Sequence, residues 1–466
     1  MIPLYLDVDT ARRELAARRP TASLERPDDV RARDLAVFGE ELTTVQVVDR
    51  IVADVRENGD AAIRKYIKGF EGVDVGPLEV DKSELEAAYQ AITPELRAAL
   101  EVAAERIRAF HEHSRRESWF DFKNGSALGQ LIVPIARVGI YAPGGRAAYP
   151  STVLMAAVPA RVAGVSEVIL VTPVGRDGQM NQSVLAAARI AGVDRVFRIG
   201  GAQAIAALAY GTESVPKVDK IVGPGSIFVV LAKQAVSGVV GIDMIPGPTE
   251  TVVVADSTAD PRWIAADMIA QAEHDPMAQS VLVCTEKSLA EAVLKELEAQ
   301  LEKTSRRELV EGAFSRRGAV VVVDSIDVAI DFANEHAPEH LCLSVADPWS
   351  HLQKVRAAGG VFLGEGSVEA LGDYTAGPSH IMPTGGTARY ASAVSLDDFT
   401  RVVPVFSYDA NQLRPEAEAA MAIAHAEGLV AHADAIAARL QHRAGDRIPR
   451  PLGSRGSHPQ APGGGR

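Results

Sequence analysis

The sequence contains only two cysteines in 466 residues, Cys284 and Cys342, and each lies in an apolar, strand-like run. No Cys-x-x-Cys spacing occurs, which argues against a cysteine-ligated metal site and against a redox motif. We therefore expect both side chains to be buried and to pack as small hydrophobic groups.

An excess of positive charge is also absent. Lysine and arginine number 48 against 61 aspartates and glutamates, so the formal net charge is −13. A chain with this charge repels phosphate backbones and anionic lipids. We expect no nucleic-acid partner.

Long hydrophobic runs are missing as well. No apolar stretch reaches the about 18 residues that a membrane-spanning helix needs. The N-terminal segment MIPLYLDVDTARRELAARRP has scattered charges and no apolar centre of the kind found in signal peptides. The expectation is a cytoplasmic protein without a membrane anchor, long enough for two or three domains.

The chain does contain hydrophobic periodicity of two kinds. Apolar residues at three- and four-residue spacing predict helices over 45–56, 82–92 and 94–113. From Pro134 onward, short β-branched runs alternate with helical segments, first up to KIVGPG and again after PGPTE. In the second series, Asp260 is expected to cap a helix with Pro261 in its first position, and Ser288 with Glu291 to cap the next.

This alternation is typical of parallel sheets covered by helices. The predicted fold class is α/β, with two Rossmann-like doubly wound parallel-sheet domains, a helical N-terminal part and a C-terminal helical extension. The expected organisation is an arm (1–25), an α/β domain built from 26–134 and 248–395, an inserted nucleotide-binding domain (135–247), the extension (396–443) and a disordered tail (444–466).

Three glycine-rich turns, IYAPGG, IGGAQA and VGPGS, each follow a predicted strand and precede a predicted helix. Phosphate-binding turns occupy this position, because the N-terminus of a helix offers free N–H groups. None of the three contains G-x-G-x-x-G, so the ordinary Rossmann fingerprint is absent.

Polar residues near the end of the helix predicted from Pro261 suggest a metal site. Gln271 and His274 are three residues apart and so project from one face, which suits two ligands of one ion. The alternative is that His274 only caps helix carbonyls.

The segment NEHAPEHL places Glu339 and His340 at the start of a strand, at a sheet edge of the kind where α/β sites gather. A carboxylate beside an imidazole supplies two proton carriers suited to neutral pH. The alternative is a solvated loop, and His336 competes for the same role.

Two further segments hold polar groups that suit a metal or a substrate. The loop LGDYTAGPSHIMPTGGTAR carries Asp373 and His380, although a turn-forming aspartate is an alternative. The Ala-rich segment AHAEGLVAHADA carries Glu427 and His432 around a break at Gly428, and a plain solvent-facing helix is the alternative there.

Several segments together resemble the histidinol dehydrogenase family over residues 42–439. In order, they are RVGIYAPGG, IGGAQAIAALAYGT, VGPGS, VGIDMIPGPTE, MIAQAEHDP, APEHL, GDYTAGPSHIMPTGGTAR and AEGLVAH. The resemblance implies a zinc-dependent oxidation of L-histidinol to L-histidine through L-histidinaldehyde, with two NAD+, at the end of histidine biosynthesis.

The resemblance also implies roles for individual residues. Proton transfer falls to Glu339 and His340, and contacts to NAD+ fall to Tyr141 and Gln203. One Zn2+ per subunit is implied, with the ligands Gln271, His274, Asp373 and His432. The implied substrate contacts are Thr249, Gln271, His274, His340, Asp373, His380, Glu427 and His432.

The family further implies a homodimer in which the C-terminal segment, with Glu427 and His432, completes the site of the partner subunit. The chain departs from the family at Ser226 and Ser379, where asparagine is common. The first departure concerns a cofactor hydrogen bond and the second concerns the substrate.

Three other functions fit parts of the pattern. A paralogue on the same fold would oxidise a different small alcohol, such as a sulfonated diol, but Glu427 and GPTE favour histidinol. A zinc hydrolase would use the metal and a glutamate to activate water, but the three glycine turns favour a nucleotide. A non-catalytic binding protein gives no reason for the Glu339 and His340 pair.

Overall fold

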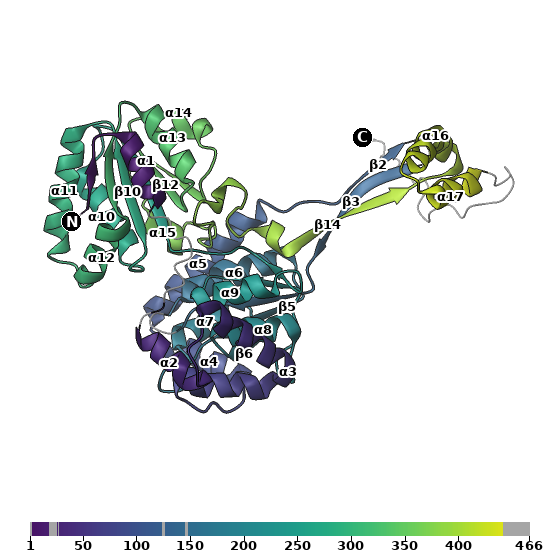
Figure 1. The fold of residues 1–466 in the computed structure, drawn as a ribbon, viewed down its shortest axis with the longest axis horizontal. Coiled ribbons are helices and arrows are strands. Elements are labelled where there is room, and N and C mark those ends of the chain that lie inside the picture. Colours follow the sequence, from purple (N-terminus) through teal and green to yellow (C-terminus); the bar gives the residue numbers. More distant parts are fainter. Residues whose placement is uncertain (1, 18–25, 27, 124–125, 145–147, 441–466) are drawn as a thin grey trace, which may run out of the picture. The chain divides into compact units, whose positions relative to one another are not determined.

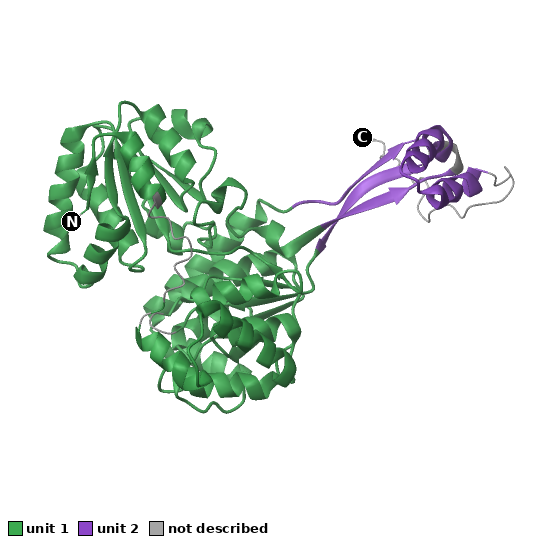
Figure 2. Cartoon of the chain, viewed as in Figure 1, with its two compact units in different colours: residues 1–115, 134–401 green, residues 116–133, 402–466 purple. Residues whose placement is uncertain are grey.

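The computed structural model describes residues 2–17, 26, 28–123, 126–144 and 148–440. The chain divides into two compact units, one made of residues 1–115 and 134–401 and the other of residues 116–133 and 402–466 (Figure 2). The predicted disordered tail, 444–466, lies outside the described residues. None of the described helices has the length and apolar character needed to cross a membrane.

A five-stranded parallel sheet lies in the first unit (Figure 1), with the strand order β6-β5-β4-β7-β8. The strand order reverses between β4 and β7, as in a doubly wound fold. Nearly all of its apolar strand residues are buried, because helices cover both faces. The strands are β4 (Arg137–Tyr141), β5 (Glu167–Thr172), β6 (Arg195–Arg198), β7 (Lys220–Val222) and β8 (Gly241–Ile242).

Each of the three predicted glycine turns connects a strand of this sheet to a helix. The helices that connect its strands are α6 (Pro150–Ala163), α7 (Gln182–Ala191), α8 (Gly201–Tyr210) and α9 (Ile227–Val236). The first turn joins β4 to α6, the second joins β6 to α8 and the third joins β7 to α9. This part of the prediction is confirmed.

The N-terminal helices α3 (Thr44–Glu71), α4 (Lys82–Ala91) and α5 (Pro94–Glu112) confirm the predicted helical segment. They pack against α8, α7 and α6 respectively, so their apolar faces share cores with the five-stranded sheet. The predicted grouping of residues 26–134 with 248–395 as one domain stays a prediction, because periodicity identifies an apolar helix face but not the surface that buries it.

The second sheet of this unit has six parallel strands in the order β1-β11-β10-β9-β12-β13. Here too the order reverses, between β9 and β12. The strands are β1 (Leu4–Tyr5), β9 (Glu250–Ala255), β10 (Gln279–Cys284), β11 (Ala319–Val322), β12 (His340–Ser344) and β13 (Gly360–Leu363). The expected N-terminal arm thus contributes an edge strand.

Seven helices of the first unit flank the six-stranded sheet within the described residues. They are α1 (Val8–Ala17), α10 (Pro261–Ala272), α11 (Lys287–Leu301), α12 (Arg307–Arg317), α13 (Ile326–His336), α14 (Pro348–His351) and α15 (Glu369–Tyr374), while α2 (Asp28–Phe38) packs on α3. Asp260 caps α10 with Pro261 in the first turn, as predicted. The predicted cap at Ser288 is wrong, since α11 begins one residue earlier and has no side-chain cap.

The second unit contains a three-stranded sheet in the order β14-β3-β2 and two helices. Its elements are β2 (Trp119–Lys123), β3 (Ser126–Pro134), β14 (Thr400–Ser407), α16 (Ala410–Ala426) and α17 (Val430–Leu440). The predicted break at Gly428 separates these two helices, because this residue takes a left-handed conformation with φ 74.

Candidate functional site

The turn between α13 and β12 carries Glu339 and His340. Ala337 ends α13 with φ 52, the one positive φ of a non-glycine residue within the described ranges. Pro338 follows and cannot continue the helix. A left-handed alanine stores backbone strain, which is typical of functional turns. Both Glu339 and His340 are buried, so the alternative of a solvated loop is wrong.

Glu339 lies against the start of the neighbouring strand β9. Its Oε2 accepts hydrogen bonds from Thr249 Oγ1 at 2.6 Å and from the Glu250 N–H at 3.2 Å. Burial raises the pKa of Glu339 to about 7, although the charge of His340 and these hydrogen bonds oppose the rise. A carboxyl with this pKa can take up a proton near neutral pH.

The His340 ring is held between polar and aromatic groups. Its Nδ1 lies 3.8 Å from Glu339 Oε2, and its centroid lies 5.7 Å from that of Phe362. Burial lowers the pKa of His340, but the negative charges of Glu339, Glu369 and Asp373 outweigh this, so the pKa is raised. Nδ1 is buried and has no hydrogen-bond partner in the part of the chain that the structure describes.

A hydrogen-bonded chain joins Gln271 to this pair. Gln271 is buried in the last turn of α10, and its Nε2 donates to Thr249 Oγ1, which in turn donates to Glu339. His274 follows three residues later but is exposed. The Thr249 hydroxyl therefore connects the predicted metal ligand Gln271 to the predicted proton carrier Glu339.

Asp373 and His380 are close enough to His340 for their charges to interact with it. His380 Nδ1 is 2.9 Å from the backbone oxygen of Asp373 and 3.9 Å from its Oδ1. Burial lowers the pKa of His380, and the positive charges of His340 and His274 lower it further, against the opposing effect of Asp373. These charges interact because the four residues share one neighbourhood.

This neighbourhood lies at the amino edge of the six-stranded sheet. Glu339 and Thr249 immediately precede the parallel strands β12 and β9, which are neighbours in the sheet. Sites in open α/β sheets usually lie at the carboxyl edge. The helices α10 and α13 both end at the amino edge, which brings Gln271 and Ala337 to the same side of the sheet.

The predicted cofactor contacts lie at the carboxyl edge of the five-stranded sheet. Tyr141 is the last residue of β4, at the reversal of strand order where nucleotides bind in such sheets. Its hydroxyl accepts the Gly201 N–H at 3.1 Å, at the start of α8, which also carries the buried Gln203.

The two edges meet through α6. Thr152 Oγ1, in the first turn of α6, lies 3.2 Å from His380 Nε2, and Ser379 Oγ donates to the Met155 oxygen at 3.1 Å. The predicted substrate contact His380 is thus hydrogen-bonded to the half that carries the predicted cofactor contacts. Ser379 thus bonds the loop that carries His380 to the backbone of α6.

Two predicted site residues lie apart from this group in the chain. Glu427 follows α16 and His432 lies in α17, both in the second unit. No three His, Cys, Asp or Glu side chains are arranged to hold a metal ion within the described ranges. Of the predicted ligands, Gln271 is an amide and so falls outside these four residue types.

Sequence reasoning missed a carboxylate under the site. Glu369, buried in α15, accepts hydrogen bonds from Thr251 of β9 and from Cys342 Sγ of β12, the latter at 3.0 Å. Cys342 is buried, as expected, but it is also a hydrogen-bond donor. The sequence signal was the i, i+4 spacing of Glu369 and Asp373, which places both on one face of the helix.

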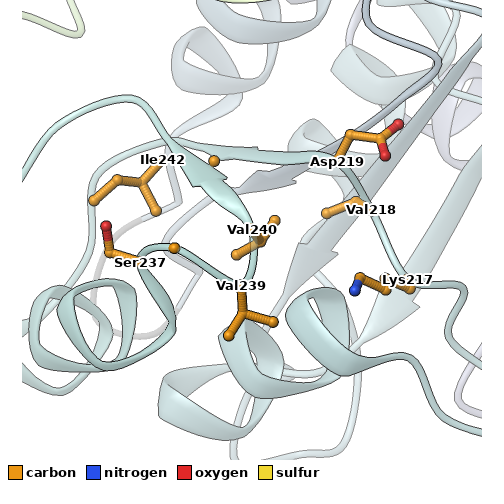
Figure 3. A pocket seen from close by; sticks show the side chains of 9 residues that line it. Lys217, Val218, Asp219, Ser237, Val239, Val240 and Ile242 are labelled. Atoms are coloured by element: carbon orange, nitrogen blue, oxygen red, sulfur yellow. The ribbon is translucent and has the colours of Figure 1, made fainter. Parts of the chain in front are cut away.

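A hollow of about 470 Å³ lies elsewhere, beside the amino ends of β7 and β8 (Figure 3). Residues 217–219 and 237–242 line it, and none of them is a predicted site residue. Tyr141 ends β4 and Gly223 follows β7, so both lie at the carboxyl edge, on the other side of the sheet from the hollow. This hollow is separate from the candidate site.

Comparison with known proteins supports the predicted resemblance. Residues 39–440 match the family model described as histidinol dehydrogenase. The chain is 51% identical to the histidinol dehydrogenase of Deinococcus radiodurans, over 91% of this chain and 98% of that protein. It is 48% identical to the enzyme of a Synechococcus species, over 90% and 96% of the two chains.

A solved structure shares the fold. The crystal structure of histidinol dehydrogenase from Elizabethkingia anophelis superimposes with a TM-score of 0.86 at 33% sequence identity. The alignment covers 94% of this chain and 98% of that one. The α/β prediction with two parallel sheets is confirmed.

Proposed function

The chain belongs to the histidinol dehydrogenase family, with that family's NAD-dependent oxidoreductase activity in histidine biosynthesis, and from this premise we propose how its residues divide the chemistry. The reaction is oxidation of L-histidinol to L-histidine through L-histidinaldehyde. NAD+, when bound, supplies the hydride acceptor for each of the two steps. The observation that carries the assignment is the buried Glu339–His340 pair, linked through Thr249 to Gln271.

The first oxidation needs a base for the alcohol proton. We assign this role to His340, whose unpartnered Nδ1 and neighbouring negative charges favour proton uptake. The alcohol O–H proton passes to His340 as the carbon loses a hydride, which leaves the aldehyde. Phe362 packs against the ring and limits its movement.

The second oxidation consumes one water molecule. We assign its activation to Glu339, because burial raises the pKa of this carboxyl to about 7 and it therefore exchanges protons near neutral pH. Glu339 takes a proton from water as the oxygen attacks the aldehyde carbon. The resulting anion of the hydrate then loses its remaining C–H hydrogen as a hydride, and the product is the carboxylic acid.

The donor set fits a zinc ion. Gln271, His274 and Asp373 offer the nitrogen and oxygen atoms that zinc accepts, and the charges of His274 and Asp373 both act on His380. We propose His432 as the fourth ligand. Zinc, when bound, would orient the imidazole and amine of the substrate.

The carboxyl edge of the five-stranded sheet fits NAD+. The helices α6, α8 and α9 begin near this edge without side-chain caps, so N–H groups of their first turns, apart from the Gly201 N–H that is bonded to Tyr141, remain available to phosphate oxygens. Gly223 has φ 122, and a Cβ there would lie 2.2 Å from the Tyr141 oxygen, so only glycine fits this turn. Tyr141 and Gln203 are the proposed contacts.

We further propose a homodimer whose second unit completes the partner's site. Large hydrophobic side chains are exposed on this unit, among them Trp119, Phe122, Phe406, Ile423 and Val430. Such a concentration of exposed apolar residues marks an interaction surface. Glu427 and His432 belong to the same unit, so a second copy would bring them to the site. The cytoplasmic location expected from the sequence stays a prediction.

A subunit-mixing experiment tests the shared site. His340→Asn and His432→Asn variants are each expected to be inactive. In a mixed dimer, one site would carry both substitutions and the other neither. Dissociating and reassociating equal amounts should therefore restore about a quarter of wild-type activity. No recovery in confirmed mixed dimers, or a fully active monomer, would contradict the proposal.

The overall reaction is tested by counting NADH formed per L-histidinol consumed. About two NADH per substrate, lost after chelation and restored by zinc, is the expected result. Turnover of a different alcohol but not of histidinol would contradict the assigned substrate.

A further inference from the structure

Glu71, the last residue of α3, is partly buried, and one of its two carboxylate oxygens has no hydrogen-bond partner among the described residues. Its Oε2 is inaccessible to solvent and accepts no hydrogen bond from the described residues. Burial raises the pKa of Glu71 to about 7, and only the charge of Arg33 opposes this. An unsatisfied buried carboxyl destabilises the free protein, so its presence calls for a functional explanation.

The packing of α3 places Glu71 near the proposed cofactor edge. The Arg56 guanidinium lies 5.2 Å from the ring of Tyr210, at the C-terminal end of α8. Beyond a kink at Gly59, the last turns of α3 contribute Tyr66 and Ile67 to the core cluster that also contains Tyr141 and Ala202, in the first turn of α8.

An electrostatic contact agrees with this placement. The pKa of Tyr141 is raised to about 12, mainly by burial and further by the charge of Glu71. The Tyr141 hydroxyl is bonded to Gly201. Glu71 is therefore close enough to Tyr141, at the end of β4, for their charges to interact.

From this position we propose that Glu71 binds the adenosine ribose of NAD+ and makes the enzyme discriminate against NADP+. The two neighbouring ribose hydroxyls are donors that would satisfy the carboxylate. A 2′-phosphate would remove one donor and place negative charge against Glu71, as acidic residues do in other dinucleotide sites. The inference rests on the proposed cofactor site and adds its specificity.

Calorimetric titration of the full-length protein with NAD+, NADP+ and ADP tests the assignment. Glu71→Gln keeps the size of the side chain and removes its charge, and Glu57→Gln, on an exposed turn of the same helix, is the matched control. We expect the Kd for NAD+ and for ADP to rise at least about tenfold in Glu71→Gln, with no weakening for NADP+. The control should bind all three as the wild type does.

The remaining outcomes separate the possibilities. Unchanged NAD+ and ADP binding in Glu71→Gln, with binding by the wild type, would overturn the role of Glu71 alone. Weaker NAD+ but unchanged ADP binding would also overturn it, since ADP carries the adenosine ribose. Equal weakening of NADP+ with a lowered Tm would indicate a structural role. No binding of NAD+ by the wild type would overturn the cofactor site as well.

Discussion

Two buried carboxylates of the first unit, Asp243 and Glu339, are held in different ways. The Asp243 side chain is fully buried with the Lys233 ammonium, and also accepts the N–H groups of Gly223 at 2.7 Å and Met244 at 2.6 Å. Glu339 has one hydroxyl and one N–H, and its nearest cationic partner is a histidine at 3.8 Å.

The difference separates a group that fixes structure from one that can react. Lys233 also donates to the Gly223 oxygen at 3.0 Å. The ion pair therefore binds both the N–H and the C=O group of Gly223, in the turn after β7. This complete set of charge and hydrogen-bond partners holds the Asp243 carboxylate in place. Glu339 lacks such a set, and its ionisation is therefore balanced near neutral pH.

The largest expected effects concern the reactive pair. Replacing His340 by Asn should lower both half-reactions by about 10²- to 10⁴-fold, because both steps release protons at this site. Glu339→Gln should lower histidinaldehyde oxidation to a similar extent and histidinol oxidation much less. Stopped-flow measurement of each half-reaction checks this, and equal loss of both steps in Glu339→Gln would contradict the division of roles.

The next effect concerns the clamped pair. Lys233→Met leaves Asp243 buried and unpaired, so the free energy of unfolding should fall by about 3–5 kcal/mol. Urea denaturation measures it, with Lys287→Met in the exposed Lys287–Glu291 pair as the control, where no measurable loss is expected. Equal stability of the Lys233 and Lys287 variants would contradict the structural role of the Lys233–Asp243 pair.

Glu339→Gln should instead become more stable than the wild type as the pH rises. The folded protein holds the Glu339 proton up to a pKa of about 7, against 4.5 for an ordinary glutamate, so wild-type stability falls as pH rises through this window. The variant lacks this loss. Its free energy of unfolding should therefore rise relative to that of the wild type by about 2–3 kcal/mol between pH 4.5 and pH 8. Asp243→Asn should lose stability throughout this range. A Glu339→Gln variant that is destabilised at pH 8 would contradict the assignment.

The smallest expected effect tests the hydroxyl between Gln271 and Glu339. Thr249→Val removes a hydrogen bond that lowers the pKa of Glu339, so the acidic limb of the pH profile for aldehyde oxidation should move to higher pH. The rate at neutral pH should fall by about tenfold. Thr249→Ser keeps the hydroxyl and should restore the wild-type profile. An unshifted profile in Thr249→Val would show that Thr249 does not influence Glu339.

Local patterns in the sequence predicted most of the fold. The cap at Asp260 and the alternation of strands and helices depend on neighbouring residues, so they can be recognised from the sequence alone. The hairpin of β2 and β3 was missed, although an Asn-Gly dipeptide at residues 124–125 is a strong turn signal between strands.

The candidate site was predictable mainly as a set of motifs. Glu339 and His340 are adjacent in sequence and were found together. The links that tune them are distant in sequence: Thr249 lies 90 residues from Glu339, and Glu369 lies 118 from Thr251. Spacing rules do not reach across such separations, which are set by the order of the strands in the sheet.

The hydrogen bond between Thr152 and His380 has a thermodynamic consequence. It joins the helix that follows β4, beside the cofactor edge, to a residue proposed to contact the substrate. Through such a contact, occupancy of one edge can bias affinity at the other, and any such bias is reciprocal. If cofactor tightens substrate binding by some factor, substrate must tighten cofactor binding by the same factor. The order in which the two ligands arrive then leaves the free energy of the ternary complex unchanged.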